Sequence, residues 1–132
     1  MKPYILIIDD DEEDREFIAE AFGKTDQEAV LYFPNALQVL GYLKKLDEHA
    51  MPNLIVTDYK MPGLDGFSFV SYLKRHKLYS EIKVVGLTSG MTEFEKDRLT
   101  TAGVTKIFTK PNTIEEYRKL ALELKDIAAG EG

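Results

Sequence analysis

Short apolar runs alternate with longer amphipathic stretches along the chain, and this alternation limits the possible folds more than any other feature. Each apolar run has the length of a buried strand, and the stretch after it has the apolar spacing of a helix. Repeated strand and helix pairs of this kind build a parallel sheet with helices on both faces. We therefore predict an α/β fold with five strands in one domain, 1–132. The expected strands are 4–8, 29–33, 54–56, 82–87 and 105–109.

The composition excludes several classes of protein. There is no cysteine, so a disulfide framework and a thiolate metal site are excluded, and a reducing, cytoplasmic setting is expected. The early apolar run, 4–8, is too short for a signal peptide or a membrane span. The net charge of -6 argues against a nucleic-acid footprint, which needs clustered Lys and Arg. We expect a soluble protein that binds neither membrane nor nucleic acid.

Polar side chains stand at the end of four of the predicted strands. Each of them alone is more simply explained as a cap or a turn residue. The carboxyl ends of parallel strands meet at one edge of the sheet, however, and ligands bind at that edge. Together these residues therefore favour a site. They are Asp9, Asp10, Asp58, Thr88 and Lys110.

Carboxylates gathered at one edge repel each other unless they bind protons or a cation. With oxygen ligands, no cysteine, and His49 and His76 far from these strand ends, the expected metal is Mg²⁺. Mg²⁺ commonly binds carboxylates together with phosphate oxygens, which points to phosphoryl transfer. In such chemistry Asp58 is the candidate nucleophile, Lys110 the cation and Thr88 the hydroxyl group.

These motifs resemble those of the response-regulator receiver domains of two-component signalling. The similar segments are ILIIDD, IVTDYKMPGLDG, VVGLTS and IFTKP, and the resemblance extends from Tyr4 to the last helix. It implies a flavodoxin-like sheet with strand order 2-1-3-4-5. It also implies that the chain is a signalling domain, which catalyses at most its own phosphorylation and dephosphorylation.

The resemblance gives each site residue an expected role. Asp58 would accept a phosphoryl group from a histidine kinase or a histidine phosphotransfer protein. Asp10 and Asp58 would hold Mg²⁺ with the backbone carbonyl of Lys60, and Asp9 would help through water. Lys60 and Gly90 stand at two positions that vary in the family and tune the lifetime of the phosphoryl group.

The resemblance further implies a conformational switch in the fourth helix, fifth strand and fifth helix. Thr88 would move toward the phosphoryl group and Lys110 would pair with it, next to a cis bond to Pro111. The fourth helix, 92–102, should be weakly held because it has few apolar residues to face inward: Phe94, Leu99 and Ala102. Ile107 replaces the usual aromatic residue three positions before the lysine.

The sequence is also compatible with other functions. A haloacid-dehalogenase-type phosphatase also uses an aspartate nucleophile, and Asp9 and Asp11 match its D-x-D pattern, but it needs a further acidic strand end after Lys110. A phosphorylation-independent interaction domain is a third possibility. The downstream partner is unknown, a homodimer is possible, and Leu122 lies off the inward face of the last helix, where it could contact a partner.

Overall fold

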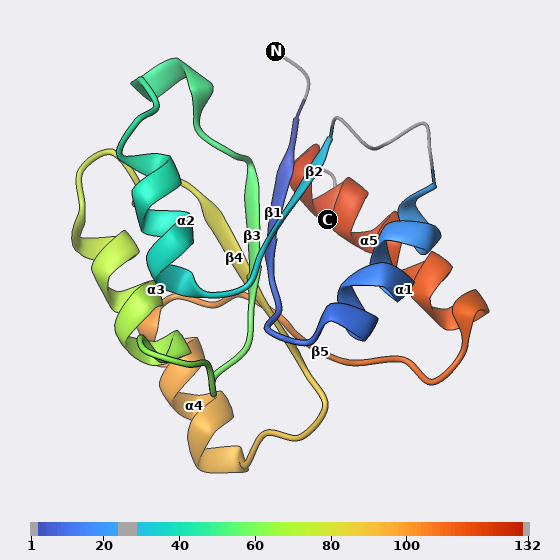
Figure 1. Cartoon of the computed structure of the whole chain (residues 1–132). Helices are drawn as coiled ribbons and strands as arrows, with labels where there is room; N and C mark the ends of the chain where they lie inside the picture. Colours follow the sequence, from blue (N-terminus) through green and yellow to red (C-terminus); the bar gives the residue numbers. More distant parts are fainter. Residues whose placement is uncertain (1–2, 24–28, 131–132) are drawn as a thin grey trace.

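The computed structural model describes residues 3–23 and 29–130. Its centre is a parallel five-stranded sheet with the order β2-β1-β3-β4-β5 (Figure 1). The fold class and strand order that the sequence predicted are confirmed. The strands are β1 (Ile5–Ile8), β2 (Val30–Phe33), β3 (Leu54–Thr57), β4 (Lys83–Thr88) and β5 (Ile107–Thr109). The helices are α1 (Glu12–Phe22), α2 (Ala36–Leu43), α3 (Gly66–Arg75), α4 (Glu93–Ala102) and α5 (Ile114–Ala128), with a short 3-10 helix, η2 (Glu48–Ala50).

The helices cover both faces of the sheet, α1 and α5 on one face and α2, α3 and α4 on the other (Figure 1). Successive strand residues point to opposite faces, so each strand contributes to both hydrophobic layers. In β1, Ile5 and Ile7 pack with α1 and α5, whereas Leu6 and Ile8 pack with the other three helices. Burial on both sides explains why the strands read as continuous apolar runs.

Side chains fix where the helices begin. Asp11 accepts a hydrogen bond from the backbone N–H of Asp14 at 3.1 Å and is the N-cap of α1. Asp65 caps α3 through Ser68 in the same way. These caps begin α1 shortly after the end of β1, and begin α3 after the loop 58–64 that follows β3.

Helix α4 is held by little apolar surface. Leu99 is fully buried, but the expected inward position of Phe94 is wrong, because its side chain is 66% exposed. Arg98 instead lies over the ring of Phe67 on α3, 3.9 Å from its centre. Weak anchoring of α4 is therefore consistent with its packing. Among the described helices, none combines the length and apolar character needed to cross a membrane.

Candidate functional site

The predicted site residues follow the carboxyl ends of the strands, at the lower edge of the sheet in Figure 1. Asp9 follows β1, Asp58 follows β3, Thr88 ends β4 and Lys110 follows β5. The last two strand ends are joined directly, since the backbone N–H of Lys110 donates to the carbonyl of Thr88 at 2.8 Å. The parallel topology thus brings these residues to one edge, as their positions in the sequence predicted.

Lys110 forms two ion pairs across the site. Its Nζ lies 3.0 Å from Oδ2 of Asp9 and 2.8 Å from Oδ2 of Asp14. Burial alone would lower the pKa of Lys110, but hydrogen bonds to Asp14 and Asp9 outweigh it and raise the pKa. Lys110 is therefore a firmly protonated cation at this edge.

The sequence interpretation missed the contact between Asp14 and Lys110. Asp14 is one of three acidic residues in the first turn of α1, where the helix dipole alone would account for its charge. Its position three residues after the cap Asp11 was the available signal, because it places Asp14 on the turn that adjoins the end of β1.

The carboxylate of Asp58 lies in a partly buried position. Burial is the largest influence on the pKa of Asp58 and raises it, and the charge of Asp9 raises it further. Three groups lower the pKa: the Tyr59 N–H through its hydrogen bond, the Thr88 side chain, and the charge of Lys110. The Tyr59 bond is 2.7 Å long. The net result is a raised pKa. Asp58 is thus a desolvated and basic carboxylate that lies among the Thr88 hydroxyl, the Lys110 cation and the Asp9 carboxylate.

Glycine is required where the loop after β3 passes close to Asp58. A Cβ on Gly66 would lie 2.1 Å from the carbonyl oxygen of Asp58, while the Gly66 N–H donates to the Tyr59 carbonyl at 2.7 Å. Gly63 has a φ of 82°, a backbone conformation that residues with a side chain rarely adopt. The spacing of these glycines therefore holds the backbone of Asp58 against the start of α3.

Thr88 is 3% exposed, and its hydroxyl oxygen accepts a hydrogen bond from the Gly90 N–H at 3.1 Å. Its O–H remains able to donate toward the site. The peptide bond between Lys110 and Pro111 is trans, so the expected cis bond is wrong. The trans form is the lower-energy isomer of such bonds by about 0.5–1 kcal/mol.

The donor groups at this edge fit a hard divalent cation. Asp9 is buried and Asp58 is half-buried, whereas Asp10 and Lys60, which follow them closely in the sequence, are exposed. Within residues 3–23 and 29–130, no three His, Cys, Asp or Glu side chains are arranged to enclose a metal by themselves. Mg²⁺ does not need such a cage, since it prefers one or two carboxylates completed by a carbonyl, phosphate and water.

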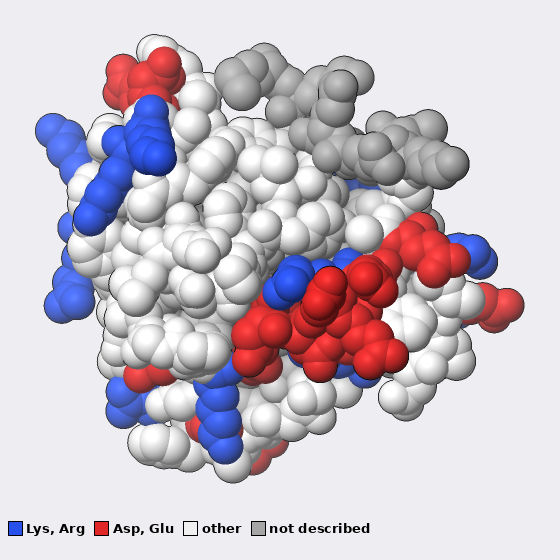
Figure 2. Space-filling view, in the orientation of Figure 1, with Lys and Arg blue, Asp and Glu red and all other residues white. Residues whose placement is uncertain are grey.

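Acidic side chains also dominate the surface around the start of α1 (Figure 2). Asp11, Glu12, Glu13 and Glu16 line an open depression there. Their summed field favours the approach of cations to this edge of the sheet.

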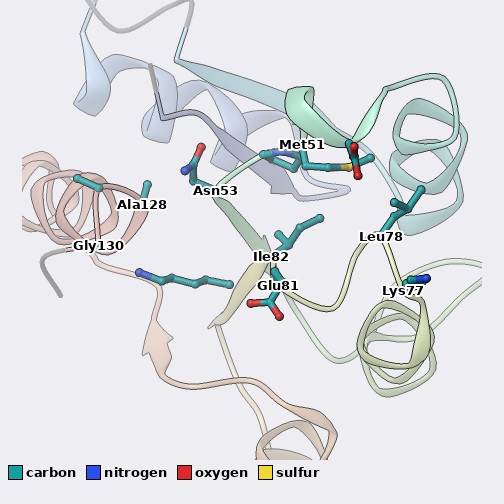
Figure 3. Close-up of a pocket in the computed structure, with 12 residues that line it drawn as sticks. Met51, Asn53, Lys77, Leu78, Glu81, Ile82, Ala128 and Gly130 are labelled. Atoms are coloured by element: carbon teal, nitrogen blue, oxygen red, sulfur yellow. The ribbon is translucent and has the colours of Figure 1, made fainter. Parts of the chain in front are cut away.

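A second pocket lies away from this chemistry (Figure 3). Its wall includes the residues before β3 and β4 and the end of α5, so it lies at the amino ends of the strands. Lys77 and Glu81 give it both signs of charge, and Lys83 uses its ammonium group to cap the Ile127 carbonyl at 3.0 Å. It contains none of the predicted site residues.

Known proteins match this chain over most of its length. The family model of the response regulator receiver domain matches residues 5–121. The sensor histidine kinase CheAY of Helicobacter pylori is 32% identical over 110 residues, which are 81% of this chain but 13% of that protein. The two-component response regulator ARR6 of Arabidopsis thaliana is 30% identical over 125 residues, 89% of this chain and 66% of that protein. The chain thus spans less than two thirds of either relative.

Solved structures share the fold. The phosphorylated cyanobacterial phytochrome response regulator RcpA has a TM-score of 0.84 at 20% identity and covers 100% of this chain and 97% of its own. The Mn(2+)-bound form of the response regulator Rcp1 has a TM-score of 0.78 at 21% identity, with 94% and 92% of the two chains covered. At these identities the likeness shows the fold alone. The family match over residues 5–121 shows that the chain belongs to the response regulator receiver domain family.

Proposed function

We propose that the chain is a phosphoacceptor domain of a two-component or phosphorelay system, phosphorylated on Asp58 in a Mg²⁺-dependent reaction. The observation that carries this proposal is the environment of Asp58. Its desolvated, basic carboxylate has the Thr88 side chain and the Lys110 charge close enough to lower its pKa. A nucleophile, a hydroxyl donor and a cation in one place are the groups that acyl phosphate formation requires.

In the transfer, phosphorus exchanges a bond to nitrogen for a bond to oxygen. A carboxylate oxygen of Asp58 attacks the phosphorus of a phosphohistidine, an O–P bond forms, and the P–N bond breaks. The electron pair of that bond stays with the imidazole nitrogen, which takes a proton from solvent. Lys110 and the O–H of Thr88 would offset the negative charge on the phosphoryl oxygens as the group arrives.

Mg²⁺, when bound, would supply the remaining positive charge next to the transferred group. We assign its binding to the carboxylates of Asp10 and Asp58 and the backbone carbonyl of Lys60, with Asp9 acting through water. The exposure of Asp10 and Lys60 supports this assignment, because Mg²⁺ keeps several waters.

The partner that donates the phosphoryl group would be a histidine kinase or a histidine phosphotransfer protein. That partnership implies a cytoplasmic location and a signalling role without turnover of an external substrate. Phosphorylation would change the binding of a downstream protein, or of a second copy, through α4, β5 and α5. The weak anchoring of α4 supports this choice of switch region.

The family match leaves the haloacid-dehalogenase-type phosphatase without support. A phosphorylation-independent interaction domain is the competing function, and one experiment separates it from the proposal. The purified chain is incubated with Mg²⁺ and a small acyl phosphate, and its intact mass is measured. The wild type and the control Glu13→Gln should gain one phosphoryl group, whereas Asp58→Asn should gain none. An unlabelled wild type would favour the interaction domain.

A further inference from the structure

The ammonium group of Lys110 forms its ion pairs with Asp9 and Asp14 and not with Asp58. It has three N–H donors. Two of them face Asp9 at 3.0 Å and Asp14 at 2.8 Å. Within residues 3–23 and 29–130, the ion pairs of Lys110 closer than 4.0 Å are these two, and Asp58 is not among its partners.

Asp14 holds this contact from a fixed position. It lies in the first turn of α1, where its backbone N–H is bonded to the cap Asp11. Its side chain is 28% exposed and that of Lys110 is 14% exposed, so water screens the pair only in part. The contact joins residues 96 positions apart in the sequence and ties the end of β5 to α1.

Asp9 and Asp14 differ in what they can do when a phosphoryl group arrives. Asp9 is buried at the end of β1, beside Asp58, and its charge acts on Asp58 directly. Asp14 approaches Lys110 from the helix. Lys110 and Asp9 are among the charges that act on Asp58, and Asp14 is not. A lysine that moves toward Asp58 would therefore keep Asp9 as a neighbour and lose Asp14.

We propose that Asp14 is a positioning residue that holds Lys110 toward α1 and competes for it with the phosphoryl group on Asp58. This inference rests on the proposed function of Asp58. The competition lowers the affinity of the site for a phosphoryl group, and phosphorylation releases the tie between β5 and α1.

The test measures the dissociation constant of beryllofluoride, a phosphoryl analogue, in the presence of Mg²⁺ by fluorine NMR. Asp14→Asn removes the charge and Asp14→Ala removes the contact altogether. Glu13→Gln is the matched control, because it removes one exposed charge from the same helical turn. Asp14→Asn should bind beryllofluoride about threefold to tenfold more tightly than Glu13→Gln, as expected for a partly screened ion pair. Asp14→Ala should bind at least as tightly, and Asp14→Glu should restore the wild-type value.

Two results would overturn the inference. Equal affinities for Asp14→Asn and Glu13→Gln would mean that only the general charge of the surface matters. Weaker binding by both Asp14 variants would mean that Asp14 directs Lys110 toward the phosphoryl group. Failure of the proposed function looks different, since beryllofluoride would then bind Asp58→Asn as well as the wild type, or would bind neither.

Discussion

Replacing Gly66 with alanine tests how closely the loop after β3 is packed against Asp58. The added Cβ would meet the Asp58 carbonyl oxygen at 2.1 Å and the Tyr59 Cα at 2.9 Å, and both are backbone atoms that cannot rotate away. Relieving such a contact costs about 1–3 kcal/mol, and loss of the Gly66–Tyr59 hydrogen bond adds about 1 kcal/mol. Alanine recovers only about 0.5–1 kcal/mol of helix propensity. The clash outweighs the gain in helix propensity, and Gly66→Ala should lower the free energy of unfolding by about 1–3.5 kcal/mol.

Gly41→Ala is the matched control, because nothing lies within 4 Å of a Cβ at this exposed position in α2. The same chemical change should there raise the free energy of unfolding by about 0.5–1 kcal/mol. Both variants are compared with the wild type by urea denaturation, and phosphoryl uptake from an acyl phosphate is measured in parallel. Uptake should fall in Gly66→Ala alone, since the Asp58 backbone has to shift. If Gly66→Ala is as stable as Gly41→Ala, the close approach described here is wrong.

Three further predictions concern α4 and the site. Leu99→Ala should lower the free energy of unfolding by about 2–5 kcal/mol in urea denaturation, whereas the exposed Phe94→Ala should change it by about 0.5 kcal/mol or less; equal effects would contradict the packing of α4. Asp58→Asn should raise thermal stability at neutral pH in the presence of a chelator. Because the pKa of Asp58 is raised in the folded protein, its protonated carboxyl stabilises the folded state at low pH. That stabilisation is lost as the pH rises through the pKa of the folded protein. The stability gained by Asp58→Asn should therefore vanish below about pH 4, the ordinary pKa of an aspartate. Lys60→Asn should change the rate of autodephosphorylation followed by intact mass, relative to the control Lys45→Asn, and an unchanged rate would remove Lys60 from that role.

The sheet could be predicted from the sequence because two signals agree in it. Each central strand is buried on both faces and so reads as a short apolar run, and each polar strand end marks where that run stops. The strand bounds shifted by one or two residues, as with the fifth strand, which was expected from Thr105 and begins at Ile107. Such ends depend on hydrogen bonds between strands that the sequence of one strand does not contain.

Long-range side-chain contacts could not be predicted in the same way. The pairing of Asp14 with Lys110 depends on the angle at which α1 leaves β1, and no spacing in the sequence reports that angle. Phe94 is expected to face inward because the fourth helix has few other apolar residues, Leu99 and Ala102. The structure shows instead that Leu99 is buried and that Arg98 covers Phe67, so one leucine and one cation–π contact replace the expected apolar face.

The position of Ile107 bears on how a change at Asp58 would reach α4 and α5. Its side chain lies against Gly86 on β4, where an added Cβ would be 3.2 Å from its Cγ1. A β-branched side chain so placed has few rotamers and no polar tip, so it cannot act as the mobile aromatic residue of many receiver domains. The backbone bond from Lys110 to Thr88 offers another route, because any shift of Thr88 toward a phosphoryl group pulls directly on the end of β5. We therefore expect β4 and β5 to move together in this chain, without a ring rotation between them.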